Sequence, residues 1–345
     1  MHTKTLIYPH LLVYWGNKGG GLRLFAETLT EIRSNGFTKV FVSTKEKNLD
    51  FLRNETNLTE ANADFLQNIR ASHVILRWPL ITKWLFRKRI KSADCVNLKS
   101  LVVLMGSPGD HVLNSLGKDG ISTTRVIHDI ETHPGDQWPT KKAIARFLKA
   151  EKIVCLSDYV YRSVDHRNKY LSSLSRKDIS FGISKPACTL PSEYFLIIGR
   201  FKKYKNLDAL EEVVLRIPEK YFVFAGKGSN RFRSVPNAIV IDRWLSDSEI
   251  EWLVKNAKVL LAVYSEASQS GVVEQALFWQ VPCIVSNIGG LPDQVSQQNL
   301  EEFIVESNDK ERVVQILCSN LDLIKAKLPK YVPRQTLYET LSNLD

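Results

Sequence analysis

The sequence predicts an α/β protein made of two Rossmann-like, doubly wound domains, and three observations lead to this prediction. The chain has 345 residues, which suits two domains of ordinary size. Hydrophobic residues make up 44% and charged residues 24%, as in globular proteins, so disorder and coiled coil are excluded as descriptions of the whole chain. Short β-branched runs alternate with amphipathic stretches in two successive series, which is typical of two parallel sheets covered by helices.

The first series of elements occupies the N-terminal half. Its apolar runs are short and rich in Val, Ile and Leu, as expected for strands that are buried on both faces. The stretches between them repeat apolar residues every three or four positions, which indicates helices. The expected strands are Thr5–Leu12, Lys39–Ser43, His73–Leu76, Leu101–Met105, Thr124–His128 and Lys152–Cys155, and the expected helices are Leu22–Asn35 and Lys141–Ala150.

The second series follows the same pattern in the C-terminal half. A capping box over Ser246-Asp247-Ser248-Glu249 marks one helix start, because the serine and glutamate side chains can satisfy free amide groups there. The expected strands are Tyr194–Ile198, Tyr221–Ala225, Ala238–Ile241, Val259–Val263 and Pro282–Val285. The expected helices are Leu207–Arg216, Asp247–Lys255 and Val272–Trp279.

A segment without periodicity, Gly182–Ser192, separates the two series and contains two prolines and one glycine. We therefore expect an N-terminal domain over residues 1–185 and a C-terminal domain over residues 186–325. Residues 326–345 form a polar tail with scattered apolar residues, and we expect a closing helix in it.

The charge of the chain is uneven. Residues 1–185 contain 29 Lys and Arg against 17 Asp and Glu, a net charge of +12, whereas residues 186–345 contain 18 against 20, a net charge of −2. A basic half indicates an anionic partner, and nucleic acid, anionic lipid and a phosphorylated substrate are all open at this point.

The cysteines and the hydropathy pattern bear on localisation. The five cysteines are an odd number without a C-x-x-C pair, which argues against a disulfide framework and favours a reducing compartment. No apolar run approaches the ~18 residues of a membrane-spanning helix. We expect a cytoplasmic protein, peripheral on the inner membrane face if the basic half meets lipid.

The most informative motif follows the expected strand Val259–Val263. It places Glu266 in a loop and Glu274 in the first turns of the next helix. Free amide groups at a helix start attract anions because the helix dipole points the same way. The alternative is that Glu274 only favours the helix start and Glu266 is solvated. The amides expected to bind an anion are those of Ser270, Gly271, Val272 and Val273.

A basic turn follows the expected strand Tyr194–Ile198. Four of the six residues from Arg200 to Lys205 are cations. Arg200 could bind a diphosphate with its planar fork and Lys205 as a point charge. The alternative is a solvated basic turn.

Two loops of the first half contain further candidates. Gly19, Gly20 and Gly21 would let the backbone approach a phosphate or sugar, or they form a plain flexible turn. His128 ends an expected strand and could act as a general base oriented by Asp129, or it is structural.

One loop of the second half could bind a base. Arg243 and Trp244 follow the expected strand Ala238–Ile241, where a flat ring could stack. No Asp-x-Asp motif and no His/Cys cluster with metal-ligand spacing occurs in the sequence. We therefore expect no tightly bound metal and no resident cofactor.

A basic amphipathic helix is expected to begin at Pro79. Apolar residues share one face of it and cations another, which is the pattern of a helix lying on anionic lipid. The alternative is a surface helix that packs its apolar face on the sheet. The apolar face comprises Leu80, Ile81, Trp84 and Leu85, and the cationic face Lys83, Arg87 and Lys91. The residues expected to meet a membrane or acceptor are Trp84, Arg87, Lys88 and Arg89.

Taken together, these motifs resemble the retaining glycosyltransferases of the GT-B fold, family 4, most closely over residues 194–295. Two positions depart from the family pattern: Ser270 replaces a frequent aromatic residue, and Gln280 replaces a glycine. The first half matches only through the glycine loop and His128-Asp129. The matching segments, in family order, are Gly199-Arg200 with Lys205-Asn206, Phe224–Gly228, Glu266 with Glu274, Ala276–Pro282 and Gly289–Pro292.

The resemblance implies a hexosyl transfer that is retaining and metal-independent, in which the leaving diphosphate assists the acceptor. It implies a nucleotide-diphosphate sugar, UDP-glucose or a close relative, in the C-terminal domain. The N-terminal domain would bind a glycan or lipid-linked saccharide acceptor of polysaccharide biosynthesis. Arg200 and Lys205 would hold the diphosphate, Glu266 the sugar hydroxyls and Glu274 the ribose. His128 would lie in the catalytic pocket.

Three other functions stay open. A nucleotide-sugar epimerase has the same two-domain fold but lacks this series of Arg, Lys and two Glu residues. A non-enzymatic, basic nucleic-acid-binding protein would use the half with a net charge of +12. No aromatic and basic motif of a nucleic-acid module occurs, so we expect no nucleic-acid partner. A third alternative is a protein that binds the donor without turning it over.

Overall fold

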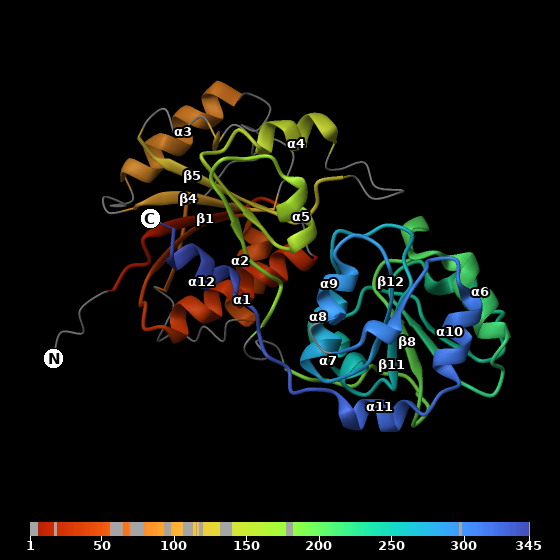
Figure 1. Ribbon diagram of the computed structural model, residues 1–345. Coiled ribbons are helices and arrows are strands. Elements are labelled where there is room, and N and C mark those ends of the chain that lie inside the picture. The colour runs from red at the N-terminus through yellow and green to blue at the C-terminus, as the bar shows by residue number, and fades with distance from the viewer. Residues whose placement is uncertain are drawn as a thin grey trace. The chain divides into compact units, whose positions relative to one another are not determined.

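A computed structural model describes residues 6–16, 19–55, 65–69, 79–92, 98–105, 113–114, 116, 120–131, 140–176, 182–296 and 299–344. The chain divides into two compact units (Figure 1). The first unit comprises Met1–Thr132, Trp138–Leu174 and Gln335–Asp345. The second comprises His133–Gln137 and Ser175–Arg334.

The division between the units lies at Leu174 and Ser175, whereas the sequence predicts it at residue 185. The segment Gly182–Ser192 belongs to the second unit, where Ser184 bonds to Ser248 through both its amide and its hydroxyl. The chain after Gln335 returns to the first unit. A loss of periodicity therefore indicates the neighbourhood of the boundary but not its residue.

The first unit is built on a seven-stranded, fully parallel sheet. All residues of its central strands are buried, which is why they consist of continuous Val, Leu and Ile runs. The strand order is β3 (Leu66–Asn68), β2 (Val40–Thr44), β1 (His10–Tyr14), β4 (Ser100–Leu104), β5 (Ser122–Ile127), β6 (Lys152–Cys155) and β7 (Lys169–Leu171).

Helices connect these strands. Thr140 and Ser157 cap two of them, because each side chain accepts a hydrogen bond from an amide of the first turn. The helices of the first unit are α1 (Gly20–Ser34), α2 (Glu46–Glu55), α3 (Pro79–Ser92), α4 (Lys141–Phe147), α5 (Asp158–Ser163) and α12 (Leu337–Ser342).

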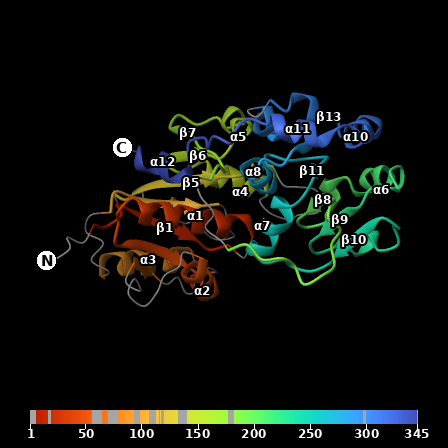
Figure 2. The ribbon, with the colours of Figure 1, turned by 90° about the horizontal axis from the view of Figure 1, so that it is seen from below.

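The C-terminal helix α12 packs on the first unit (Figure 2). The rings of Tyr8 and Tyr338 lie 6.3 Å apart, and the Thr336 hydroxyl donates to Glu31 of α1 over 3.0 Å. His10 of β1 is hydrogen bonded to the Leu341 backbone. The expected closing helix therefore completes the first unit, although the residues that precede it in the chain belong to the second unit.

The second unit is built on a six-stranded parallel sheet. Its core includes Phe224 and Phe232, whose rings stack at 4.0 Å. The strand order is β10 (Ala238–Ile241), β9 (Phe222–Ala225), β8 (Phe195–Ile198), β11 (Val259–Ala262), β12 (Cys283–Ser286) and β13 (Ile304–Val305).

Helices and short 3₁₀ turns flank this sheet. The capping box predicted at Ser246 is present, with Glu249 as its second member. The helices are α6 (Leu207–Leu215), α7 (Asp247–Lys255), α8 (Gly271–Phe278), α9 (Leu291–Ser296), α10 (Lys310–Leu317) and α11 (Leu321–Lys327). The 3₁₀ turns are η4 (Lys203–Lys205), η5 (Ser229–Phe232) and η6 (Glu301–Phe303).

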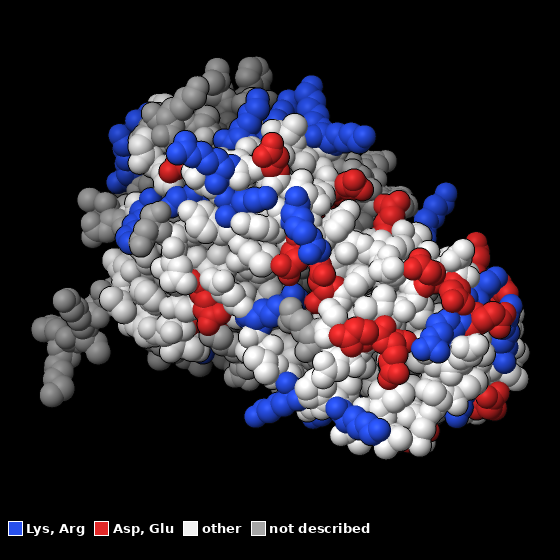
Figure 3. All heavy atoms as spheres, viewed as in Figure 1, with Lys and Arg blue, Asp and Glu red and all other residues white. Residues whose placement is uncertain are grey.

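The two units differ in surface charge, as the sequence predicts. On the face drawn in Figure 3, Lys and Arg side chains predominate over the first unit, and most of the acidic side chains lie over the second. The doubly wound α/β prediction is confirmed for both units, because each has a parallel sheet with connecting helices. The predicted strand His73–Leu76 lies outside the described residues.

Candidate functional site

The candidate site of the second unit lies where β8 and β11, which are neighbours in the sheet, end (Figure 1). We call residues 199–206 the β8 loop and residues 263–270 the β11 loop. The Ser265 amide donates to the Tyr204 carbonyl over 2.7 Å, and the Tyr204 and Tyr264 rings meet edge to face at 5.6 Å. The basic turn and the segment before α8 are therefore joined directly.

Two glycines allow these loops to approach their neighbours closely. Gly226 has a φ of 133°, and a Cβ atom there would lie 2.1 Å from the Gly199 carbonyl oxygen. Gly289 has a φ of 57°, and its Cβ atom would lie 1.6 Å from the Ala267 carbonyl oxygen. Neither position can accept a side chain without moving backbone, so the loops after four adjacent strands form one packed surface.

Lys205 is the most buried cation of this surface, with only 2% of the residue exposed. Its Nζ atom donates to the Ile198 carbonyl over 3.0 Å and to the Tyr264 hydroxyl over 2.9 Å. Burial is the main cause that lowers the pKa of this ammonium group, and the charge of Arg200 lowers it further. Within the described residues no carboxylate pairs with it, and its Nζ lies 5.6 and 4.3 Å from the ring centres of Tyr204 and Tyr264.

Tyr264 links Lys205 to the start of α8. Its hydroxyl accepts from Lys205 and is also hydrogen bonded to the Ser270 side chain. Burial raises the pKa of this phenol to about 12, so it stays neutral at physiological pH. In the motif at residues 264–274 the sequence predicts roles for the two carboxylates and none for this tyrosine.

The start of α8 is open on its solvent side. Gly271 is exposed, and a Cβ atom built on it would meet no atom within 4 Å. The amides of Gly271, Val272 and Val273 occupy the first turn, where a helix provides no internal acceptor. The Ser270 amide differs from the expectation, because it already donates to Gln294 over 2.8 Å. Three of the four expected amide donors are therefore available.

Arg200 and Glu266 are exposed on the two joined loops. Arg200 lies near enough to Lys205 for its charge to act on that ammonium group. Both side chains can therefore reach a ligand above the loops, and their predicted contacts to diphosphate and sugar stay predictions.

Glu274 is buried instead, with 3% of the residue exposed. Its Oε1 accepts from the Ser175 hydroxyl at 3.0 Å and the Tyr331 hydroxyl at 2.7 Å. Its Oε2 accepts from Gln294 at 3.3 Å and lies 3.8 Å from an Arg334 Nη2. The carboxylate thus holds the two ends of the second unit against α8, and its predicted contact to a ribose stays a prediction.

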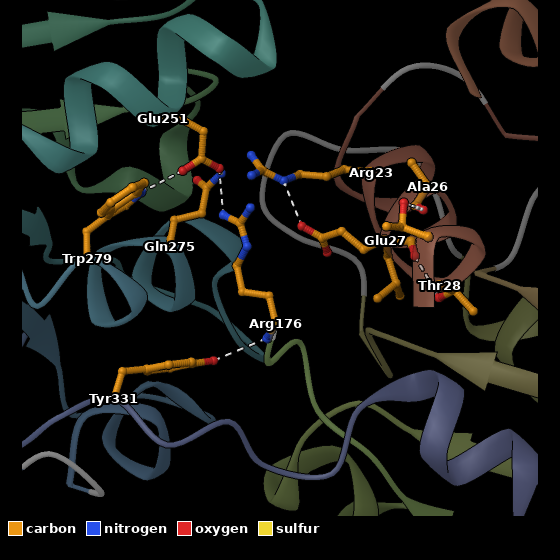
Figure 4. Close-up of polar contacts among 11 residues, drawn as sticks. Arg23, Ala26, Glu27, Thr28, Arg176, Glu251, Gln275, Trp279 and Tyr331 are labelled. Atoms are coloured by element: carbon orange, nitrogen blue, oxygen red, sulfur yellow. Dashed lines mark hydrogen bonds and ion pairs between the residues drawn. The ribbon is translucent and has the colours of Figure 1, made fainter. Parts of the chain in front are cut away.

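A second buried carboxylate, Glu251 of α7, has a similar arrangement (Figure 4). Arg176 approaches its Oε1 at 2.6 Å, and the Trp279 indole donates to its Oε2 over 2.7 Å. Gln275 donates to Oε1 over 3.3 Å, and the Arg176 amide bonds to Tyr331. Sequence reasoning missed this cluster because its members are far apart in the chain and belong to no motif.

The predicted base-binding residues lie on the loop after the edge strand β10. Arg243 binds the Glu249 carboxylate with both Nη atoms, at 2.8 and 2.6 Å, and this pairing lowers the pKa of Glu249 to about 2. The guanidinium fork is therefore occupied within the protein. Trp244 is 60% exposed and presents a free ring face on which a base could stack.

Gln280 follows α8 where the resembled family has glycine, and it has a left-handed backbone with a φ of 53°. The glycine-like conformation is therefore kept although the residue is not glycine, at a strain of roughly 1–2 kcal/mol.

The predicted residues of the first unit lie on two loops. Gly19, Gly20 and Gly21 lie at the start of α1, and Gly21 is buried where a Cβ atom would lie 2.5 Å from the Met105 sulfur. Gly21 is therefore required for packing, whereas Gly19 and Gly20 have open space around them. His128 follows β5, and its Nδ1 lies 2.8 Å from an Asp129 oxygen, so the expected orienting pair is present.

Helix α3 packs on the first unit through a different face from the one that the sequence predicts. Its core-facing residues are Phe86 and Ile90, whereas Ile81 is 47% and Trp84 61% exposed. The Lys88 ammonium lies 5.5 Å from the Trp84 ring centre. The alternative that the predicted apolar face covers the sheet is therefore wrong for Ile81 and Trp84.

The described residues contain neither a membrane-spanning helix nor a metal-binding cluster. No helix there combines the length and apolarity needed to cross a lipid bilayer. No group of three or more His, Cys, Asp or Glu residues in the same part of the chain has the geometry to hold a metal ion.

Comparison with known sequences gives one match. Residues 192–322, which include both loops and α8, match the family described as Glycosyl transferases group 1. No curated protein matches the chain significantly.

Solved structures match over nearly the whole chain. HepE of Anabaena, in complex with UDP and glucose, has 12% identity and a TM-score of 0.67 and covers 97% of this chain and 100% of its own. WaaG, a glycosyltransferase involved in lipopolysaccharide biosynthesis, has 15% identity, a TM-score of 0.56 and 92% coverage of both chains. A Listeria monocytogenes protein assigned as a UDP-N-acetylglucosamine 2-epimerase has 11% identity, a TM-score of 0.58 and coverages of 92% and 89%.

At these identities the structural likeness establishes the fold and not the reaction. The chain therefore has the two-domain GT-B fold of these proteins, and its residues 192–322 match the model of the glycosyl transferases of group 1.

Proposed function

We propose that the chain is a hexosyltransferase that uses a nucleoside-diphosphate sugar, with UDP-glucose or a close relative as donor. The acceptor is a hydroxyl of a glycan or lipid-linked saccharide in polysaccharide biosynthesis. Transfer retains the anomeric configuration, and fixed protein charges act in place of a metal. The family match of residues 192–322 and the geometry of the β8 and β11 loops support this proposal.

One observation carries the proposal: the buried Lys205 ammonium has no carboxylate partner among the described residues and connects through Tyr264 to the start of α8. Breaking the bond between sugar and phosphate builds negative charge on the diphosphate. Cations and amide groups that are already aimed at that charge stabilise the transition state without reorganisation. Lys205, Arg200 and the α8 amides supply such groups at adjoining positions.

The remaining roles follow the same logic. Glu266, exposed on the β11 loop, binds sugar hydroxyls and favours positive charge on the sugar. His128, oriented by Asp129, aligns the acceptor hydroxyl, whose proton passes to the leaving diphosphate. Trp244 stacks on the base.

The donor is identified by a thermal-shift panel of UDP-, GDP-, ADP- and TDP-sugars. Binding stabilises the folded state by RT ln(1 + [L]/Kd), about 2.7 kcal/mol at one hundred times Kd. We expect the UDP-sugars to give the largest rise in unfolding temperature. A panel in which no nucleotide raises that temperature contradicts the proposal.

The alternatives differ in what they need beyond the donor. An epimerase changes UDP-N-acetylglucosamine without an acceptor, which NMR of the sugar detects, whereas the transferase requires a saccharide. A protein that binds donor without turnover shows the thermal shift but releases no UDP in the presence of acceptors. A nucleic-acid-binding protein retains RNA or DNA with a steep salt dependence.

We further propose that α3 places the first unit on an anionic membrane surface, where a lipid-linked acceptor lies. The exposed Trp84 and Ile81, with Lys88 beside the tryptophan ring, support this, because an interfacial helix buries such residues and keeps its cations at the headgroups. Arg87 and Arg89 add charge on the same helix.

Co-sedimentation with anionic vesicles tests the membrane proposal. Replacing Trp84 by Ala together with Lys88→Gln should weaken binding by about tenfold, since each nearby cation contributes about 1 kcal/mol. The double variant Lys141→Gln, Lys142→Gln removes exposed charge from α4 and should have a smaller effect. Equal binding of the α3 variant and the parent protein would exclude this surface.

A further inference from the structure

Gln294 of α9 holds the residue that precedes α8. Its Oε1 accepts from the Ser270 amide over 2.8 Å, and its Nε2 donates to the Ser270 carbonyl over 3.1 Å. One side-chain amide thus satisfies both backbone groups of a single buried residue. The same Nε2 donates to Glu274 over 3.3 Å, and Gln294 itself is only 3% exposed.

This arrangement fixes the direction of the first turn of α8. Ser270 is the residue at which the extended β11 loop becomes helix, with a φ of −138° and a ψ of 119°, and its side chain makes no capping bond to the helix. The Ser270 side chain bonds to Tyr264 and not to the helix, so Gln294 is the side chain that fixes the orientation of the Ser270 backbone. Rotation at this residue would turn the amides of Gly271, Val272 and Val273 away from their common axis.

The close contact of Gly289 with the β11 loop restricts the same segment of backbone a second time. Gly289 precedes α9 and lies against the Ala267 carbonyl, and Gln294 lies one turn further along. The β11 loop is therefore held at two points, at Ala267 by Gly289 and at Ser270 by Gln294. The sequence motifs assign no role in the site to Gln294 itself.

We propose that Gln294 is a positioning residue for the donor diphosphate, which aims the three free amides of α8 by clamping the Ser270 peptide. This inference rests on the proposed function. It assigns Gln294 no contact with the substrate.

The ionisable groups around the Gln294 side-chain amide determine which substitution can test its role. Glu274 of α8 accepts from its Nε2 through Oε2, which also lies 3.8 Å from Arg334, whereas Tyr331 donates to the other oxygen of that carboxylate. Asp293 precedes it on α9. The neighbouring β12 and η6 contribute the buried Cys283 and the exposed Glu301 and Glu302.

Gln294→Glu is the decisive variant because it has nearly the same shape and two protonation states. The ionised acid cannot donate to the Ser270 carbonyl and adds a negative charge beside Glu274 and the anion site. The protonated acid can accept from the Ser270 amide and donate its one hydrogen to the Ser270 carbonyl, so it restores both bonds to Ser270 but not the native bond to Glu274. Burial and the Glu274 charge favour the protonated form, so this state is accessible in mild acid.

We expect calorimetric titration with UDP to show binding to Gln294→Glu about 10- to 50-fold weaker than wild type at pH 8. At pH 5.5 the ratio of the two dissociation constants should return toward one. Gln315→Glu, at an exposed position of α10, makes the same change of charge and should match wild type at both pH values.

Two outcomes overturn the inference: wild-type affinity of Gln294→Glu at pH 8, or equal weakening at both pH values. If the variant does not fold at pH 8, Gln294→Met replaces it, because it leaves Ser270 unclamped at every pH. That variant must bind UDP more weakly than wild type, with no recovery in acid, and wild-type affinity overturns the inference. If wild type binds neither UDP nor pyrophosphate, the proposed function is wrong as well. If wild type and the Gln294 variants bind UDP equally, only the role of Gln294 is wrong.

Discussion

Lys205 illustrates how a single residue can combine a structural and a chemical role. Its ammonium group ties β8 to Tyr264, and in the proposed function the same group also binds the diphosphate. The structure adds two features that the basic turn in the sequence cannot reveal, the complete burial of this lysine and its connection to α8. Both arise because β8 and β11 are adjacent in the sheet although they are far apart in the chain.

Replacing Lys205 or Arg200 by Ala should reduce kcat/KM for the donor by roughly 10- to 150-fold, which corresponds to about 1.5–3 kcal/mol for a lost charged hydrogen bond. Lys203 is exposed in the same 3₁₀ turn and provides the matched control, since Lys203→Ala removes equal charge outside the buried connection. Steady-state kinetics with varied donor measures the effect. Activity near wild type in both Arg200→Ala and Lys205→Ala would refute the diphosphate assignment.

His10 predicts the acid sensitivity of the first unit. Burial, with a smaller effect of the Lys99 charge, lowers the pKa of this imidazole to about 4 from its ordinary 6.5. The unfolded chain therefore binds the proton first as pH falls. The contribution of neutral His10 to stability is complete above pH 6.5 and is lost as the pH falls toward 4, by up to about 3 kcal/mol.

Calorimetric unfolding between pH 4 and pH 7.5 checks this expectation. His10→Asn removes the titrating group, so its first unit should lose less stability over that interval than wild type does. An identical pH dependence in the two proteins would show that other groups cause the acid sensitivity.

At the residue scale, the sequence predicts which side chains are polar and near a strand end, but not which of them face a ligand. Glu274 and Glu266 belong to one motif, yet Glu266 is exposed and Glu274 bonds to Ser175, Tyr331 and Gln294 inside the unit. Contacts between residues so distant in the chain depend on topology, and no local pattern encodes them.

Secondary-structure elements were more predictable than individual contacts. The strand Lys152–Cys155 and the helix Asp247–Lys255 have the predicted bounds, because each has a strong pattern and a clear end. The edge strands β3, β7 and β13 were missed, since runs of 3, 3 and 2 residues are too short to show a period. β1 begins at His10 rather than Thr5, after Pro9, which has no amide hydrogen to donate to a neighbouring strand.

Glycine positions control the packing of the loop elements. Gly289→Ala combines a left-handed backbone with a collision against the Ala267 carbonyl, and should cost the second unit roughly 2–5 kcal/mol. Gly271→Ala has open space and a helical backbone, so it should leave stability almost unchanged. Thermal unfolding of both variants tests this contrast. Equal unfolding temperatures would show that the loop can yield and that the surface is not held rigidly.

At the scale of the whole molecule, the two units differ in charge and in the sequence features that they contain. The first unit is basic and has the exposed α3 side chains, whereas the second contains the residues that match glycosyl transferases of group 1. The return of α12 makes the first unit discontinuous in sequence, because residues 175–334 between its parts belong to the second unit. The GT-B prediction itself succeeds because it depends on patterns repeated over many elements.

The proposed function requires that the β8 loop cations and the open end of α8 form a single site for a nucleoside diphosphate. A crystal structure of the protein with UDP tests this claim most directly. We predict diphosphate oxygens within about 3.2 Å of the amide nitrogens of Gly271, Val272 or Val273, with the Arg200 guanidinium on the same group. UDP bound with its diphosphate away from both α8 and the β8 loop would contradict the claim.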